Sequence, residues 1–175
     1  MKKLPFLLGL MMTFLLIQNT AKALTIEQTI KEWERAKAYT KQYLDVMPED
    51  GYSFKPTPEI RSFAEQMLHL ADANYGFSAM LSGIPSPIER GGAEKMADKS
   101  KAATTKMVMD SYDFVINALK SMDAAKMQEM VKFAGQDLSK EQGFAKCFEH
   151  QTHHRGQATV YIRLKGIKPP NEMLF

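Results

Sequence analysis

The ten residues Phe148-Glu149-His150-Gln151-Thr152-His153-His154-Arg155-Gly156-Gln157 form the segment around which the rest of the sequence can be arranged. Within it, His150 and His154 stand four residues apart. On a helix this spacing places both imidazoles on one face, one turn apart, where they can hold a single metal ion. The same spacing also suits surface or core histidines that serve only the fold.

The surrounding residues predict that this segment is helical. Ser139-Lys140-Glu141-Gln142 fits a capping box, Gly166 is suited to the C′ position, and Pro169-Pro170 prevent the helix from continuing. At about 100° per residue, His154 lies roughly 40° to one side of His150, and His153 roughly 60° to the other. His150 and His154 are therefore the better ligand pair. A sector of roughly 80° holds Cys147, His150, His154, Gln157 and Tyr161.

Residues 1–23 are typical of a secretory signal peptide. Lys2-Lys3 precede the apolar run Leu4–Ile17, and Ala21-Lys22-Ala23 forms a small-x-small cleavage site. An uncleaved membrane anchor is the alternative, but the run is short for a span. We therefore expect an exported, periplasmic or secreted protein, with one domain over residues 24–175 and no stable membrane anchor after cleavage.

Charge and cysteine content narrow the functional classes. The formal charge of +3 comes from Lys2, Lys3 and Lys22, so the remaining 20 basic and 20 acidic residues cancel. A neutral chain gives no reason to expect a nucleic-acid partner. Cys147 is the only cysteine, which excludes an internal disulfide. The fold must depend on its hydrophobic core, with or without a metal.

Three further amphipathic helices are predicted. The first begins at the capping box Thr25-Ile26-Glu27-Gln28 and ends near Met47, with Trp33 in the core. The second begins at Thr57-Pro58-Glu59 and ends near Gly83. The third covers residues 96–122. Residues 84–95 are expected to be a loop at a pocket rim, and 123–138 a connector with a short helix over 124–133. Four long helices and no convincing strand predict an all-α four-helix bundle.

His69 lies in the middle of the second predicted helix. A lone histidine there is more often a core residue than a ligand, but a pair of candidate ligands exists elsewhere in the chain. Glu65 and Asp72 flank His69 and could accept its second N–H group. The pair His150 and His154 shifts the balance toward a ligand role for His69 without excluding the core role. His153, Gln157 and Tyr161 are candidates for further neighbours or pocket residues.

The sequence resembles the pattern of the DinB-like (DinB/YfiT-like) superfamily of metalloenzymes at two places. These are His69 and the later segment His150-Gln151-Thr152-His153-His154-Arg155-Gly156-Gln157. That pattern is a histidine in the second helix, then H-x-x-x-H-R-G-Q near the C-terminus. Phe77, eight residues after His69, also fits, and the resemblance covers nearly all of residues 24–175.

The resemblance implies a bundle of up-down-down-up topology. It also implies a divalent metal held by His69, His150 and His154, with open positions for water or substrate. Zinc and nickel both occur in such proteins, which makes them the expected metals, although three neutral imidazoles would also suit iron or copper. Homodimers are common in the superfamily, so the resemblance leaves a homodimer open.

Three functions stay open at this point. The first is a metal-dependent hydrolase that acts on an unknown small-molecule substrate through a metal-activated water. The second is metal-dependent thiol S-transfer, which some relatives perform but which fits poorly with export, because low-molecular-weight thiols are scarce outside the cytoplasm. The third is a non-catalytic metal- or ligand-binding bundle, in which Cys147 or His153 would supply a fourth ligand.

Overall fold

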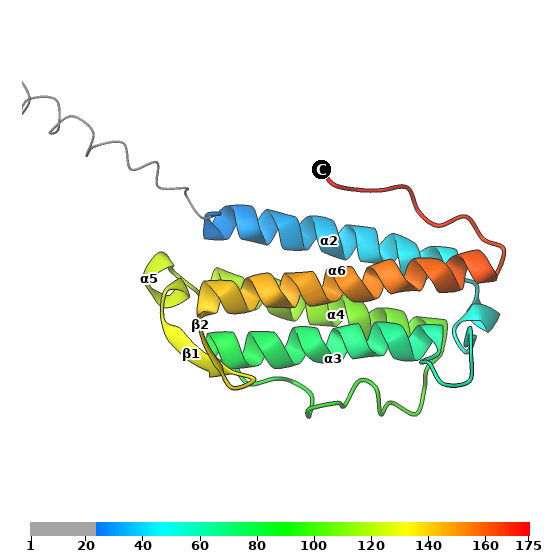
Figure 1. Cartoon of the computed structure of the whole chain (residues 1–175), viewed down its shortest axis with the longest axis horizontal. Coiled ribbons are helices and arrows are strands. Elements are labelled where there is room, and N and C mark those ends of the chain that lie inside the picture. Colours follow the sequence, from blue (N-terminus) through cyan, green and yellow to red (C-terminus); the bar gives the residue numbers. More distant parts are fainter. Residues whose placement is uncertain (1–23) are drawn as a thin grey trace, which may run out of the picture.

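The computed structural model describes residues 24–175, so the predicted signal peptide lies outside the described residues. Four long helices make up most of the domain (Figure 1). They are α2 (Ile26–Val46), α3 (Phe63–Ser82), α4 (Lys101–Lys120) and α6 (Lys140–Leu164). The shorter elements are the 3-10 turn η1 (Glu49–Gly51), helix α5 (Ala124–Met127) and strands β1 (Met130–Phe133) and β2 (Gln136–Ser139).

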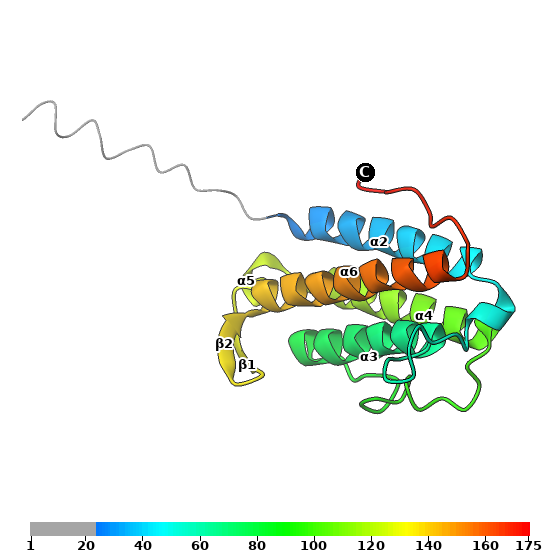
Figure 2. The same ribbon diagram turned by 45° about the vertical axis from the view of Figure 1, so that its right-hand side comes forward.

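The four long helices form a bundle of up-down-down-up topology, as predicted. Helices α2 and α6 run in one direction, and α3 and α4 in the other (Figure 1). Helix α3 packs against α4 and α6, and α2 packs against the same two helices. Two consecutive helices can be parallel only if the chain returns along the bundle between them. The connection from α3 to α4 does so in both views (Figures 1 and 2).

Local capping explains where most of these helices begin and end. The predicted capping boxes at Thr25 and Ser139 are both formed, and α2 ends at Val46 with Met47 as its C-cap, close to the predicted end. The predicted C′ residue Gly166 has a φ of +74°, which an L side chain rarely adopts. These signals are short-range, so the sequence was sufficient to place them.

Two helix starts were predicted too early. Helix α3 does not begin at Thr57, because Ser62 and Glu65 form a capping box that starts it at Phe63. Helix α4 does not begin at Met96, because Ser100 is its N-cap and accepts the N–H of Ala103. The residues just before Ser62 and Ser100, which were predicted to be helical, are instead irregular.

The connector between α4 and α6 contains a hairpin that the sequence analysis missed. Strands β1 and β2 pair antiparallel, with Phe133 opposite Gln136, after a short α5 that ends at Met127. The two-residue turn has positive φ at Ala134 (48°) and Gly135 (83°), which is the pattern of a type I′ turn. Alanine is an unusual first residue for that turn, so the local signal for a hairpin was weak.

The core positions α6 closely against its neighbours. Trp33 is fully buried, as predicted, and its ring meets Tyr112 and Phe148 edge-on. A Cβ atom at Gly143 would lie 2.3 Å from a methyl carbon of Leu81, so a larger residue there would force the buried Leu81 side chain to move. Of the described helices, none combines the length and apolar character needed to cross a bilayer.

Candidate metal centre

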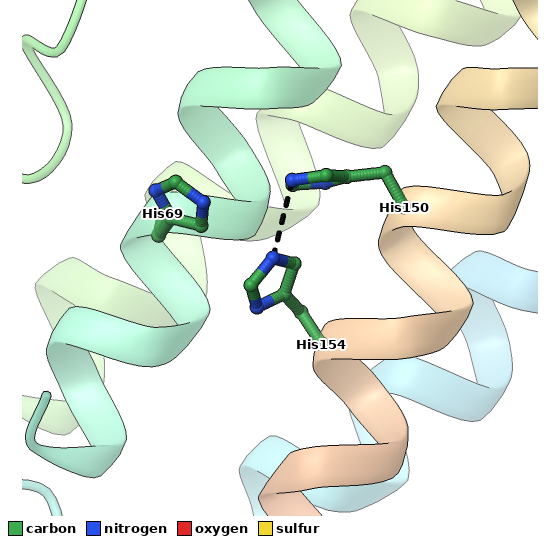
Figure 3. A group of neighbouring side chains, drawn as sticks. All are labelled: His69, His150 and His154. Atoms are coloured by element: carbon green, nitrogen blue, oxygen red, sulfur yellow. Dashed lines mark hydrogen bonds between the residues drawn. The ribbon is translucent and has the colours of Figure 1, made fainter. Parts of the chain in front are cut away.

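Three histidine side chains from two helices converge between α3 and α6. His69 extends from α3 toward His150 and His154, which extend from successive turns of α6 (Figure 3). Their ring nitrogens offer one ligand atom each, and these three atoms lie within 4.8 Å of one another. The structure thus brings together the three histidines that the sequence singled out.

The orientation of α6 is set by polar residues on its buried side. Gln151 is fully buried, and its Oε1 accepts hydrogen bonds from Tyr112 Oη (2.8 Å) and Arg155 (3.0 Å). The Arg155 guanidinium also lies over the Tyr39 ring, 4.5 Å from its centroid. Because these residues anchor one side of α6 inside the bundle, His150 and His154 are directed toward α3.

The carboxylate of Glu94 holds His69. The Glu94 Oε1 atom lies 2.5 Å from His69 Nδ1, and Arg61 donates to the other carboxylate oxygen at 3.1 Å. Arg61 also lies 3.1 Å from His69 Nδ1, but a carboxylate can only accept, so we assign the Nδ1 proton to the bond with Glu94. This tautomer leaves the His69 Nε2 lone pair free for a metal.

Asp72 places Glu94 without touching His69. Its two carboxylate oxygens accept the backbone N–H groups of Ala93 (3.0 Å) and Glu94 (2.8 Å). This pair of bonds ties the long α3–α4 connection to α3. Burial raises the pKa of Glu94, but the hydrogen bonds from His69 and Arg61 and the charge of Arg61 outweigh burial and hold that pKa below its ordinary value.

A chain of side-chain amides holds His154. Gln66 Nε2 lies 2.8 Å from His154 Nδ1 and also contacts Gln157 Oε1, while Gln157 Nε2 lies 2.7 Å from His153 Nε2. The oxygen and nitrogen of an amide can be exchanged without altering the geometry. With both amides turned over, Gln66 Oε1 accepts the His154 Nδ1 proton, and His154 Nε2 is free for a metal.

His150 and His154 have the protonation state that metal binding needs. Burial, followed by the charges of neighbouring histidines, lowers the pKa of His150 to about 4 and that of His154 to about 3. Both rings are therefore neutral near pH 7. Their Nε2 atoms are 3.1 Å apart, close to the roughly 3.3 Å expected for two nitrogens on one tetrahedral zinc. The donor set fits a divalent transition-metal ion.

The coordination group has three members. Cys147 is fully buried and its Sγ faces Asn74 Oδ1, while His153 is exposed and contacts Gln157. Burial raises the pKa of the Cys147 thiol well above its ordinary value, which disfavours the thiolate that binds metal. Within residues 24–175, no fourth histidine, cysteine or carboxylate joins the group. Neither candidate for a fourth ligand is in place.

The other sequence candidates occupy different positions. Glu65 does not accept from His69; its carboxylate accepts the Ser62 N–H and contacts Lys99 and Lys55. Tyr161 donates to the carbonyl of Arg61 at 2.9 Å and lines a cavity beside the site. Gln157 takes part in the amide chain that holds His154. Asp72 acts on His69 only through Glu94.

Three residues at the site escaped the sequence analysis. Gln66 lies almost one turn before His69 on α3, so helical spacing could have indicated it. Arg61 and Glu94 lie outside the regular helices, and Glu94 is 25 residues from His69. No local pattern connects a loop carboxylate to a helix histidine at that separation.

Two cavities flank the three histidines. One, of about 640 Å³, is lined by residues that include Arg61, Gln66, Gln157 and Tyr161. The other, of about 450 Å³, lies between α3, α6 and the hairpin, and His150 and His153 are among its lining residues. The expected rim at residues 84–95 supplies Glu94 to the site but no wall to either cavity. Of the three histidines, only His150 lines either of these cavities, namely the smaller one; the larger cavity meets the site at Arg61 and Gln66, which contact His69 and His154.

Comparison with known proteins agrees with this architecture. The chain is 24% identical over 153 residues to the uncharacterised protein YrdA of Bacillus subtilis, which covers 83% of this chain and 86% of YrdA. A DinB-like protein from Bacillus cereus has the same fold, with a TM-score of 0.74 and 22% identity over 85% of this chain and 97% of its own.

A second solved structure is YfiT from Bacillus subtilis, described as a probable metal-dependent hydrolase with an unusual four-helix bundle topology. Its TM-score is 0.63, at 16% identity, and the alignment covers 84% of this chain and 93% of YfiT. At this identity the likeness establishes the fold alone. The family model for DinB matches residues 18–173, and the chain therefore belongs to the DinB family.

Proposed function

We propose that this protein is a metal-dependent enzyme of the hydrolase type, with His69, His150 and His154 as ligands of a zinc or nickel ion. The observation that carries the proposal is the convergence of three imidazoles without a fourth protein ligand among the described residues. Two of them are neutral, the buried His154 and the partly buried His150. A site with three protein ligands keeps a position for water or substrate, as catalytic sites do. The description of YfiT supports the same class.

Each protein group has a defined part in this function. A bound divalent ion would supply a Lewis acid that lowers the pKa of a ligated water and polarises a substrate oxygen. Glu94 holds His69 in the tautomer that presents Nε2, and the amide of Gln66 can do the same for His154. Phe77, whose ring centroid is 6.0 Å from that of His150, shields the site on one side.

The location of the protein is part of the proposal. The pattern of residues 1–23 supports export from the cytoplasm. Low-molecular-weight thiols are scarce outside the cytoplasm. Hydrolysis, which needs only water as co-substrate, suits that environment better than thiol transfer. The substrate is proposed to be a small molecule, because the two cavities beside the histidines have volumes of about 640 and 450 Å³.

Metal content measured by mass spectrometry tests the ligand assignment. Untagged protein should carry about one divalent ion per chain, and His69→Ala and His154→Ala should each lose it. His153→Ala is the matched control, since His153 lies on the same helix outside the ligand group. Wild-type protein that carries no ion and gains no thermal stability from zinc or nickel would refute the proposal.

Catalysis needs a separate assay. The loaded wild type is expected to hydrolyse at least one member of a panel of ester, amide, lactone and phosphoester substrates, and His154→Ala to lack that activity. Thiol-dependent turnover without hydrolysis would indicate S-transfer instead. An ion with four protein ligands in X-ray absorption spectra, together with an inactive panel, would indicate a binding protein.

A further inference from the structure

The smaller cavity beside His150 has an aromatic wall. Phe77 of α3 and Phe133 of β1 face each other, with ring centroids 4.6 Å apart and planes inclined by 35°. Leu138 of β2 adds a further apolar side chain, and the cavity, of about 450 Å³, extends to His150. The wall therefore leads from the hairpin directly to the metal centre.

The charges around this cavity cancel. Lys146 and Glu149 both line it, and they bond to each other, with Nζ and Oε2 separated by 2.7 Å. This exposed pair balances the lysine and carboxylate charges that line the cavity, so they give it no net charge. Apolar walls beside a paired charge favour a neutral group, because a charged one would lose its hydration without gaining a partner.

The larger cavity does not identify a ligand class in the same way. Its one cationic side chain, Arg61, is bonded to Glu94, and the hydroxyl of Tyr161 is bonded to the carbonyl of Arg61. Gln66 and Gln157 are bonded to each other. The main polar groups of the larger cavity therefore already have partners. The aromatic cavity indicates the class of ligand more clearly.

We infer that the cavity formed by Phe77, Phe133 and Leu138 binds a neutral aromatic group of the substrate, with the group that reacts placed next to it at the histidines. Aromatic rings pack favourably against other rings in tilted or offset geometry, and the cavity is large enough for one or two rings. The hairpin is then an element of substrate specificity. The placement of the reacting group rests on the proposed function; the binding of an aromatic group does not.

The binding of an aromatic group can be tested without metal, with the neutral fluorophore N-phenyl-1-naphthylamine. We expect it to bind the metal-free protein with increased fluorescence, and Phe133→Ala to weaken its affinity on the order of tenfold. Phe133→Leu keeps apolar volume and should weaken it less. The matched control is Phe114→Ala, which removes a half-buried ring from α4, where it packs on Tyr75, and should bind as wild type does.

Circular dichroism of each variant shows whether it is folded. The inference is overturned if the fluorophore does not bind the folded wild type, or if it binds folded Phe133→Ala and Phe133→Leu as tightly as wild type.

Two hydroxamic acids, measured calorimetrically on zinc-loaded protein, test whether the cavity serves the metal centre. Benzohydroxamate should bind about tenfold tighter than acetohydroxamate in wild type, and this ratio should fall toward one in Phe133→Ala. Binding of acetohydroxamate without any gain from the phenyl ring would overturn the placement of the substrate. Binding of the fluorophore but of neither hydroxamate would refute the proposed function and leave the aromatic cavity standing.

Discussion

Replacement of Gln66 tests how His154 is prepared for a metal ion. Gln66 is buried on α3, with 3% of its surface exposed, and its amide lies 2.8 Å from His154 Nδ1. When His154 Nε2 donates its lone pair to an ion, Nδ1 must carry the proton. Gln66 Oε1 is then the acceptor of that proton. Gln66→Leu keeps much of the volume and removes the acceptor.

The size of the effect follows from this geometry. A buried N–H group without an acceptor costs about 1–3 kcal/mol, which corresponds to roughly 5- to 150-fold in affinity. Loss of a hydrogen-bond partner of a metal-bound histidine weakens binding by about 10- to 100-fold, which agrees with this range. We therefore expect Gln66→Leu to weaken zinc binding by about 10- to 100-fold. Gln66→Glu, which offers only acceptors, should bind zinc at least as tightly as wild type.

The assay is a competition titration of metal-free protein against a chromophoric zinc chelator, at fixed pH and salt. Gln42→Leu is the matched control, because Gln42 lies exposed on α2. Wild-type affinity in a folded Gln66→Leu variant would refute the role of the amide. A loss of affinity in Gln66→Glu equal to that in Gln66→Leu would show that the amide N–H, and not the oxygen, faces His154.

Two further predictions concern the fold around the site. The hydrogen bond from the Ser62 N–H, aided by Lys99, lowers the pKa of Glu65 from 4.5 to about 2. The stability that this carboxylate contributes is therefore present above pH 4.5 and is lost as the pH falls toward 2. In acid denaturation followed by circular dichroism, Glu65→Gln should therefore lose less stability than wild type over this range; an equal loss would contradict the assignment. Ala134→Gly should slow amide hydrogen exchange in β1 and β2 roughly 2- to 5-fold, because glycine adopts the positive φ of 48° without strain; faster exchange would show that the turn is not strained.

The sequence alone determined the features that depend on residues close together in the chain. Capping boxes at Thr25 and Ser139, the C′ glycine at Gly166 and the i, i+4 spacing of His150 and His154 each act within about one helical turn. Such signals settle which segments are helical and which side chains share a face. The resemblance to the DinB pattern then joined His69 to His150 and His154 as a ligand and added the up-down-down-up order of the helices.

Tertiary structure decided what depends on distant segments. Glu94 reaches His69 only because Asp72 ties the returning connection to α3, and Gln66 meets His154 only because α3 and α6 are neighbours. The sequence did not predict the hairpin, because strands of four residues carry too little periodicity to be recognised alone. Its contact with the bundle, where Phe133 packs on Phe77, is a tertiary contact. Local spacing places ligands on a helix, whereas the groups that orient them and the cavity beside them come from contacts between elements that no local pattern encodes.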